Sequence, residues 1–200
     1  MIHPLKKYCA KAVLTLAFLA SSCNILPEVT DKTTNLEPET ITYTISKGEH
    51  SSSGSSFKRL NTQKVRFEVT FDKSAIYTTT DPSNQADINK LYGLSDCGNQ
   101  HHVNSARFGW RWYNNQLELH AYTYLAQARK SEYITSIPLD KAALCELTLD
   151  NGKYIFNVNG VQVTLPRGCN GKMDAYQLYP YFGGDEVAPH DIKIYIKELL

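Results

Sequence analysis

Ionisable and aromatic side chains alternate with apolar residues around an Asn-Asn pair in the stretch "GWRWYNNQLELHAYTY", from Gly109 to Tyr124. If Asn114 and Asn115 form a two-residue turn, the flanking segments pair as an antiparallel hairpin, and successive side chains point to opposite faces. One face is then core, with Phe108, Trp110, Trp112, Leu117, Leu119 and Ala121. The opposite face carries Arg107, Arg111, Tyr113, Gln116, Glu118, His120, Tyr122 and Tyr124.

This polar face has a composition suited to sugar rings. Tyrosine offers flat apolar area with a hydroxyl group, and Arg, Glu and Gln supply directional hydrogen bonds. The face could equally be ordinary solvated sheet, in which Arg111 opposite Glu118 forms a cross-strand ion pair contributing about 0.2–1 kcal/mol. We predict a polysaccharide or oligosaccharide ligand, bound by Arg107, Arg111, Tyr113, Glu118, His120, Tyr122 and Tyr124.

The stretch "DCGNQHHVNS" places His101 and His102 beside Asp96 and Cys97, just before the ribbon. Adjacent side chains point apart on an extended chain, so we do not expect the two histidines to share a metal ion. We predict instead a loop that rims the polar face.

The stretch "YPYFGGDEVAPHDI" is rich in tyrosines and carboxylates around Gly183-Gly184. Its oxygen ligands could hold calcium, although two glycines also suit an ordinary tight turn. No other cofactor and no metal site is predicted. The residues concerned are Tyr179, Tyr181, Asp185, Glu186, His190 and Asp191, and the tyrosines would add an aromatic edge to the polar face.

Strands must position these groups. Apolar residues alternate with polar ones through 41–45, 65–71 and 192–196, whereas "PSNQADINKLYG" suggests one short turn of helix. Asn151-Gly152 and Asn159-Gly160 are typical of two-residue hairpin turns, because both positions need positive φ. The expected partners are Leu147 with Phe156, Leu149 with Tyr154, Tyr154 with Leu165, Phe156 with Val163, and Val158 with Val161.

Both turns place large apolar residues on one face, which predicts an all-β, antiparallel β-sandwich. We predict that residues 40–200 form this sandwich as a single domain. Of the cysteines in this domain, Cys97, Cys145 and Cys169, one pair could form a disulfide in an exported protein. The pair is left open, with Cys97–Cys169 as one candidate.

The segments "YIFNVNGVQVTL" and "HDIKIYIKEL" resemble the second half of concanavalin-A-like jelly-roll domains. The ribbon from "NSARFGWRWY" onward, together with "YPYFGGDEVAPHD", is similar to envelope lipoproteins of Bacteroides-type bacteria. The resemblance spans about residues 40 to 200. It implies a jelly roll with one open, concave sheet.

Some jelly-roll proteins are polysaccharide lyases, which as a family use a His or Tyr base, a Tyr acid and an Arg or Gln that neutralises a uronate carboxylate. By residue type, the candidates here are His120, Tyr122, Arg111 and Gln116. The longer lyase motifs are absent, and so is the ExDxxE-like run of concanavalin-A-like glucanases. We expect glycan binding without catalysis first, a lyase-like enzyme second, and a structural or adhesive lipoprotein that binds another envelope protein third.

The N-terminal segment predicts export and anchoring. Lys6, Lys7 and Lys11 precede a short apolar run that leads into "LASSC", which resembles a lipoprotein signal over 1–22 with lipid attached to Cys23. Residues 23–39 would then be the lipidated cysteine and a flexible tether. We expect a protein held by its lipid in the bacterial cell envelope, at the outer membrane; the alternative is ordinary secretion, with Cys23 in an unmodified tail.

Charge excludes one class of partner. The chain has 21 basic and 20 acidic side chains, and the signal segment contains three lysines and no acids. The remaining chain is therefore near neutral and has no electrostatic footprint for nucleic acid.

Overall fold

The computed structural model describes residues 38–170 and 174–199. The predicted signal peptide, Cys23 and nearly all of the predicted tether lie outside the described residues. Within the described ranges, no helix is long and apolar enough to span a membrane.

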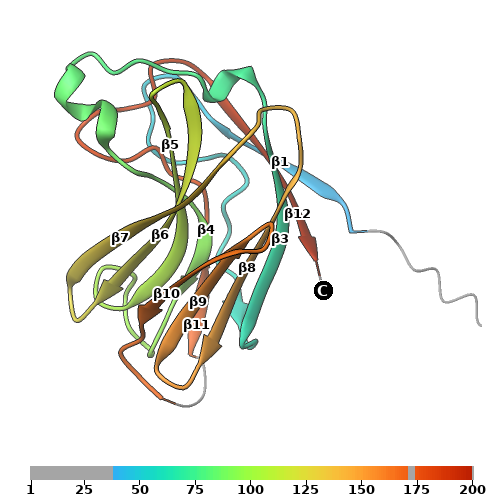
Figure 1. The fold of residues 1–200 in the computed structure, drawn as a ribbon, viewed down its shortest axis with the longest axis vertical. Coiled ribbons are helices and arrows are strands. Elements are labelled where there is room, and N and C mark those ends of the chain that lie inside the picture. The colour runs from blue at the N-terminus through green and yellow to red at the C-terminus, as the bar shows by residue number, and fades with distance from the viewer. Residues whose placement is uncertain (1–37, 171–173, 200) are drawn as a thin grey trace, which may run out of the picture. The chain divides into compact units, whose positions relative to one another are not determined.

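Two six-stranded antiparallel sheets make up the fold (Figure 1). The first, called here the β3 sheet, runs in the order β1 (Thr40–Ile45), β12 (Ile192–Leu199), β3 (Lys64–Phe71), β8 (Ala143–Asp150), β9 (Lys153–Val158) and β10 (Val161–Pro166). The second, the β5 sheet, runs β2 (Arg59–Leu60), β11 (Ala175–Leu178), β4 (Asn89–Ser95), β5 (Ser105–Tyr113), β6 (Gln116–Leu125) and β7 (Ala128–Ile137). The expected all-β sandwich is confirmed.

Short 3₁₀ turns supply the helical structure of the described chain: η1 (Lys73–Ala75) and η2 (Pro82–Ala86). The second coincides with the predicted helical turn. Its Asp81 cap accepts a hydrogen bond from the Ser83 backbone N–H, and Pro82 suits the first position because it has no N–H to leave unpaired.

The predicted registers are confirmed in all three hairpins. Asn114 and Asn115 have φ values of 50° and 57°, and the ribbon pairs Arg107 with Tyr122 and Trp112 with Leu117. Around the two Asn-Gly turns the pairs are again those expected. Because the side-chain period of a strand is two, a correct register places every inward and outward residue correctly.

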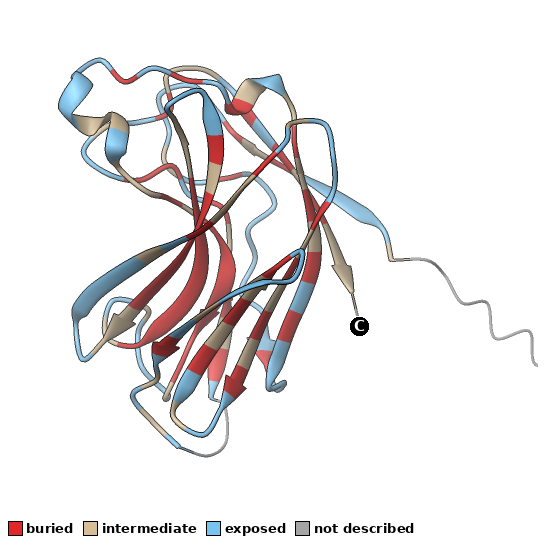
Figure 2. Ribbon diagram, viewed as in Figure 1, coloured by how far each residue is buried: buried red, intermediate tan, exposed pale blue. Residues whose placement is uncertain are grey.

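The core lies between the sheets, and most of the long strands contribute alternate residues to it (Figure 2). Phe108 on β5 packs edge-on against Phe67 and Phe156 of the β3 sheet, with ring centroids 5.5 and 5.2 Å away. Trp110 is completely buried, and Trp112 packs partly buried at the margin of the core. The outer face of the β5 sheet is therefore free to carry polar groups.

Strand β7 follows a turn at Ala126 and Gln127, which have φ values of 48° and 70°. Neither residue favours positive φ, so the sequence carries no turn signal there. The strand nevertheless pairs with β6 along its length, with Tyr124 opposite Arg129. This pairing brings Arg129 to the polar face.

Cys97 and Cys169 form a disulfide, and Cys145 is a free, buried thiol. Beside the disulfide, Asp96 is fully buried and accepts two hydrogen bonds from Arg167, at 2.5 and 3.0 Å, and one from the Tyr154 hydroxyl at 2.7 Å. The disulfide and this ion pair tie the start of the histidine loop to the connection after β10.

Replacing both Cys97 and Cys169 with alanine is expected to lower the free energy of unfolding by about 2–4 kcal/mol, because a 72-residue closure is lost from the unfolded chain. Denaturant unfolding measures the loss. The wild type in reductant should match the double variant, and reductant should not alter the variant further. Equal stability of the oxidised wild type and the variant would contradict this.

Candidate functional site

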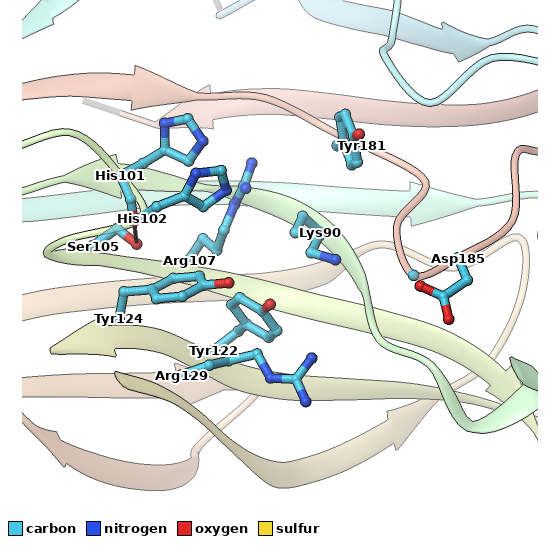
Figure 3. Close-up of a pocket in the computed structure, with 11 residues that line it drawn as sticks. Lys90, His101, His102, Ser105, Arg107, Tyr122, Tyr124, Arg129, Tyr181 and Asp185 are labelled. Atoms are coloured by element: carbon cyan, nitrogen blue, oxygen red, sulfur yellow. Dashed lines mark hydrogen bonds between the residues drawn. The ribbon is translucent and has the colours of Figure 1, made fainter. Parts of the chain in front are cut away.

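A cavity of about 350 Å³ opens on the outer face of the β5 sheet (Figure 3). Strands β4 to β7 form its floor, and the loops before β5 and after β11 form its rim. It is lined by Lys90, His101, His102, Ser105, Arg107, Tyr122, Tyr124, Arg129, Tyr181, Gly184 and Asp185. Three basic side chains, those of Lys90, Arg107 and Arg129, face the single carboxylate of Asp185, so the cavity favours an anionic ligand.

Arg107 is the most unusual of these residues, because its guanidinium is almost buried, with 9% of the residue exposed. Its Nη2 donates to the Tyr179 carbonyl at 2.9 Å, whereas its Nε is buried and has no hydrogen-bond partner among the described residues. Burial lowers the pKa of Arg107 to about 10, which still leaves it cationic at neutral pH. A buried cation with an unused donor is costly unless an anion pairs with it.

Two glycines make room for the cations. Gly93 on β4 lies opposite Arg107, where a Cβ would fall 2.4 Å from the Arg107 Cα. A Cβ on Gly183 would fall 2.2 Å from the Nζ of Lys90. Glycine is therefore required at Gly93, where the nearest atoms are backbone, whereas a side chain at Gly183 would displace the flexible end of Lys90.

Lys90 on β4 pairs with Gly109 of β5, on the same face as Arg107, and the register of β4 is irregular between Lys90 and Gly93. Its Nζ lies 5.4 Å from the centre of the Tyr122 ring and 6.0 Å from that of Tyr181. Burial, with a smaller effect from neighbouring arginines, lowers the pKa of Lys90 to about 8. A substantial fraction of Lys90 is therefore neutral near pH 8 and able to accept a proton.

Tyr122 and Tyr124 follow one another on the pocket face of β6, with ring centroids 6.0 Å apart. Tyr122 is 3% exposed, and burial, followed by the neighbouring Tyr124, raises its pKa to about 12. Tyr122 therefore keeps its proton at neutral pH. In Figure 3 the side chains of Lys90, Tyr122 and Arg107 surround a common space.

The histidine loop lies at the rim of this face, as predicted, but the two side chains do not point apart. The ring centroids of His101 and His102 are 4.2 Å from one another. The segment is a turn, closed by the hydrogen bond from the Val103 backbone N–H to the Gln100 carbonyl at 2.8 Å, so the geometry of an extended chain does not apply. The Nδ1 of His101 hydrogen-bonds the Tyr176 hydroxyl at 3.0 Å, and burial lowers the pKa of His101.

Several predicted site residues lie outside the cavity. Glu118 accepts a hydrogen bond from the Nε of Arg111 at 2.6 Å and lies 3.1 Å from the Nε2 of His120. Arg111 also donates to the Ala86 carbonyl in η2 at 2.6 Å, and its guanidinium lies 4.4 Å from the Tyr113 ring. Arg111, Glu118 and His120 therefore use their polar atoms on one another and on η2.

The outcome for the predicted residues is thus divided. The cavity includes Arg107, Tyr122 and Tyr124, but not Arg111, Tyr113, Gln116, Glu118 or His120. The catalytic candidates Arg111, Gln116 and His120 therefore do not lie together with Tyr122 in this pocket. Gln116 instead accepts a hydrogen bond from Ser136 at 2.9 Å.

The proposed calcium loop uses its side chains for structure. Glu186 accepts hydrogen bonds from the backbone N–H groups of Thr80 and Asp81 at 2.7 and 2.8 Å. Asp191 accepts from the Lys47 backbone N–H, and His190 lies within hydrogen-bonding distance of the Ser74 carbonyl. These groups engage separate partners and do not converge on one point.

Among the described residues, side chains of the metal-ligand type do come together at Asp96, Cys97 and Cys169. The two cysteines are joined as a disulfide, so they offer no thiolate to a metal.

Sequence reasoning missed Lys90, Ser105 and Arg129. Continuing the alternation of β5 two residues before Arg107 would have found Ser105. Lys90 and Arg129 belong to β4 and β7, whose pairing with the ribbon could not be deduced from any local turn signal.

No protein-family profile matches the chain, and no curated protein matches it in sequence. Among solved structures, it is similar to alginate lyase vAL-1 from Chlorella virus, with 17% identity and a TM-score of 0.51 over 83% of this chain and 85% of that one. Alginate lyase AlyC3 has 14% identity and a TM-score of 0.56, over 80% of this chain and 74% of that one. The catalytic domain of an endo-1,3-beta-glucanase (laminarinase) from Thermotoga petrophila RKU-1 has 10% identity and a TM-score of 0.51, over 80% of this chain and 75% of that one.

At these identities the likeness concerns the fold alone. The fold is a concanavalin-A-like jelly-roll sandwich. Its particular feature is a cationic, tyrosine-lined pocket on the outer face of the β5 sheet.

Proposed function

We propose that this protein is a polysaccharide lyase that binds a uronate-containing polymer in the pocket and cleaves it by β-elimination. The observation that supports this most strongly is the buried Arg107, whose Nε has no partner among the described residues. A uronate carboxylate would supply both the negative charge and the acceptor that the guanidinium needs. That two of the similar folds are alginate lyases makes alginate the first substrate to test.

The pocket supplies the three roles that β-elimination requires. Arg107 pairs with the uronate carboxylate and stabilises the charge that develops when the C5 proton is removed. Neutral Lys90 takes that proton, the C5–H electrons form a C4–C5 double bond, and the bond from C4 to the glycosidic oxygen breaks. Tyr122 gives its proton to the departing oxygen. The opposite pKa shifts of Lys90 and Tyr122 support this assignment.

Binding without catalysis, our first expectation from the sequence, explains the pocket less fully. A surface that only binds sugars has no need of a lysine with a lowered pKa next to a protonated, buried tyrosine. A retaining glycosidase would need two carboxyl groups about 5–5.5 Å apart. Among the described residues that line the pocket, the only carboxylate is Asp185.

The role of Lys90 predicts the pH profile. A lysine accepts a proton only when it is neutral, so kcat/KM should rise as pH increases through about 8 and level off above that value. An unperturbed lysine would place this rise near 10.4. Lys90→Arg should remove the activity, while Lys130→Arg on β7, outside the pocket, should not. A profile that is flat from pH 6 to 9 would count against Lys90 as the base.

A substrate panel tests the proposal itself. Elimination leaves a C4–C5 double bond conjugated to the carboxylate, which absorbs ultraviolet light that the intact polymer does not. We expect this absorbance to appear with alginate or another uronate polymer and not with laminarin, a neutral glucan. Binding of glycans without any new absorbance would return the protein to the non-catalytic class. If no glycan binds and another envelope protein is captured, the adhesive alternative would be favoured.

We also propose, from the sequence alone, that the protein is attached to the cell envelope by lipid on Cys23. Replacing Cys23 with alanine should release the protein from the membrane fraction, because the attached acyl chains supply the membrane affinity. Cys145→Ala serves as the control and should stay with the membrane. A Cys23→Ala protein that fractionates like the wild type would contradict lipidation.

A further inference from the structure

A series of rings leads out of the pocket toward the edge of the β5 sheet. Tyr124 lies next to His102, at 5.5 Å between centroids, and His102 next to His101 at 4.2 Å. His101 is followed by Tyr176 at 6.3 Å, and Tyr176 by Phe57 at 5.9 Å. The rings therefore continue from the cavity to a residue that does not line it.

The strand registers explain this arrangement. Ser105 pairs with Tyr124 on one side and with Ser95 on the other, and the Ser95 hydroxyl accepts a hydrogen bond from the Tyr176 backbone N–H at 2.9 Å. Tyr176 in turn pairs with Arg59 on the edge strand β2. One transverse row of the sheet thus joins the pocket to Arg59.

The far end of this row is exposed and cationic. Phe57 is 78% exposed, the highest value among the large apolar side chains of the described chain. A single exposed apolar residue needs no explanation, but Phe57 contacts Tyr176 at the end of a continuous aromatic series. Arg59 is exposed and has no ion-pair partner among the described residues.

We infer that Phe57, Arg59 and Tyr176 form a distal subsite for the same anionic polymer, an inference that rests on the proposed function. Between β5 and β2 there are three strand spacings, about 14 Å, a span that an oligosaccharide can bridge and a monosaccharide cannot. Phe57 and Tyr176 offer apolar faces to sugar rings, and Arg59 offers a cation to a second uronate. The polymer then lies across the strands, with several sugars on one side of the bond that is cleaved.

The dependence of activity on substrate length tests this subsite. We would measure kcat/KM for uronate oligomers from the trimer upward and for the polymer, using the wild type, Phe57→Ala and Arg59→Ala. Each variant should lose about tenfold on long oligomers and progressively less as the oligomer becomes too short to reach from the pocket to Phe57 and Arg59. The Arg59→Ala loss should shrink at high salt, since it concerns an exposed charge.

Matched controls on the β3 sheet are Val161→Ala, an exposed apolar residue, and Lys153→Ala, an exposed cation. Both should behave as the wild type at every length. Because all four side chains are exposed, thermal unfolding should be unchanged.

The outcomes separate the two claims. If the wild type cleaves the polymer and both variants match it at every length, the distal subsite is wrong and the lyase stands. If the wild type yields no unsaturated product, the proposed function fails. Calorimetric titration of long uronate oligomers then decides the subsite by itself, since unchanged affinity in both variants, or no binding by the wild type, overturns it.

Discussion

Arg107→Met is expected to slow cleavage severely while leaving the protein at least as stable as the wild type. The guanidinium meets the substrate carboxylate in this account, so its loss should lower kcat/KM by about 10³-fold. In the free protein, however, it is a buried cation with one hydrogen bond to Tyr179 and an unused Nε. Methionine fills a similar volume without the cost of a buried charge.

Thermal unfolding and steady-state kinetics on the same preparation test both parts. Arg107→Lys keeps the charge but loses the planar fork that pairs with a carboxylate, so it should recover only part of the activity. Activity near that of the wild type in Arg107→Met would show that Arg107 does not contact the substrate. A large fall in unfolding temperature would show that the guanidinium is structural.

Tyr122→Phe should give the second largest loss of cleavage activity. The ring remains in place beside Lys90, while the hydroxyl that protonates the leaving oxygen is removed. Loss of a general acid typically costs about 10²–10⁴-fold in rate, so kcat should fall by that factor with little change in KM.

Tyr133→Phe is the matched control. Tyr133 is a half-exposed tyrosine on β7 whose hydroxyl lies 3.1 Å from the Ser136 hydroxyl, outside the pocket. The control should keep full activity. An equal loss in both variants would show that the effect is not specific to Tyr122, and a wild-type rate in Tyr122→Phe would remove it from the mechanism.

The hairpin of β5 and β6 shows how much structure can be predicted from local sequence patterns. Asn114 and Asn115 tolerate positive φ, and that fact determines the register of β5 and β6 and therefore both faces of the hairpin. The same reasoning predicted the two Asn-Gly hairpins of the β3 sheet. Turn chemistry is local, so it can be read from a single sequence.

Turn signals could not predict which end of the polar face forms the pocket. The end with Arg111 and Glu118 is closed by η2, through the hydrogen bond from Arg111 to the Ala86 carbonyl, whereas the end with Arg107 stays open. Lys90 reaches the open end from β4, which pairs with β5 across the histidine loop, and Arg129 reaches it from β7, which follows β6 after the turn at Ala126 and Gln127. Neither connection contains the Asn-Asn or Asn-Gly pair that identifies a two-residue turn in the sequence, so these two pairings could not be predicted.

The most direct test of the account is the mass of the products that the wild type releases from a defined uronate oligomer. Elimination breaks the glycosidic bond without adding water, so the product masses should sum to that of the substrate, and one product should carry an unsaturated terminal ring. Products heavier by one water would show hydrolysis. Intact oligomer that remains bound to the protein would show that the pocket binds glycan without cleaving it.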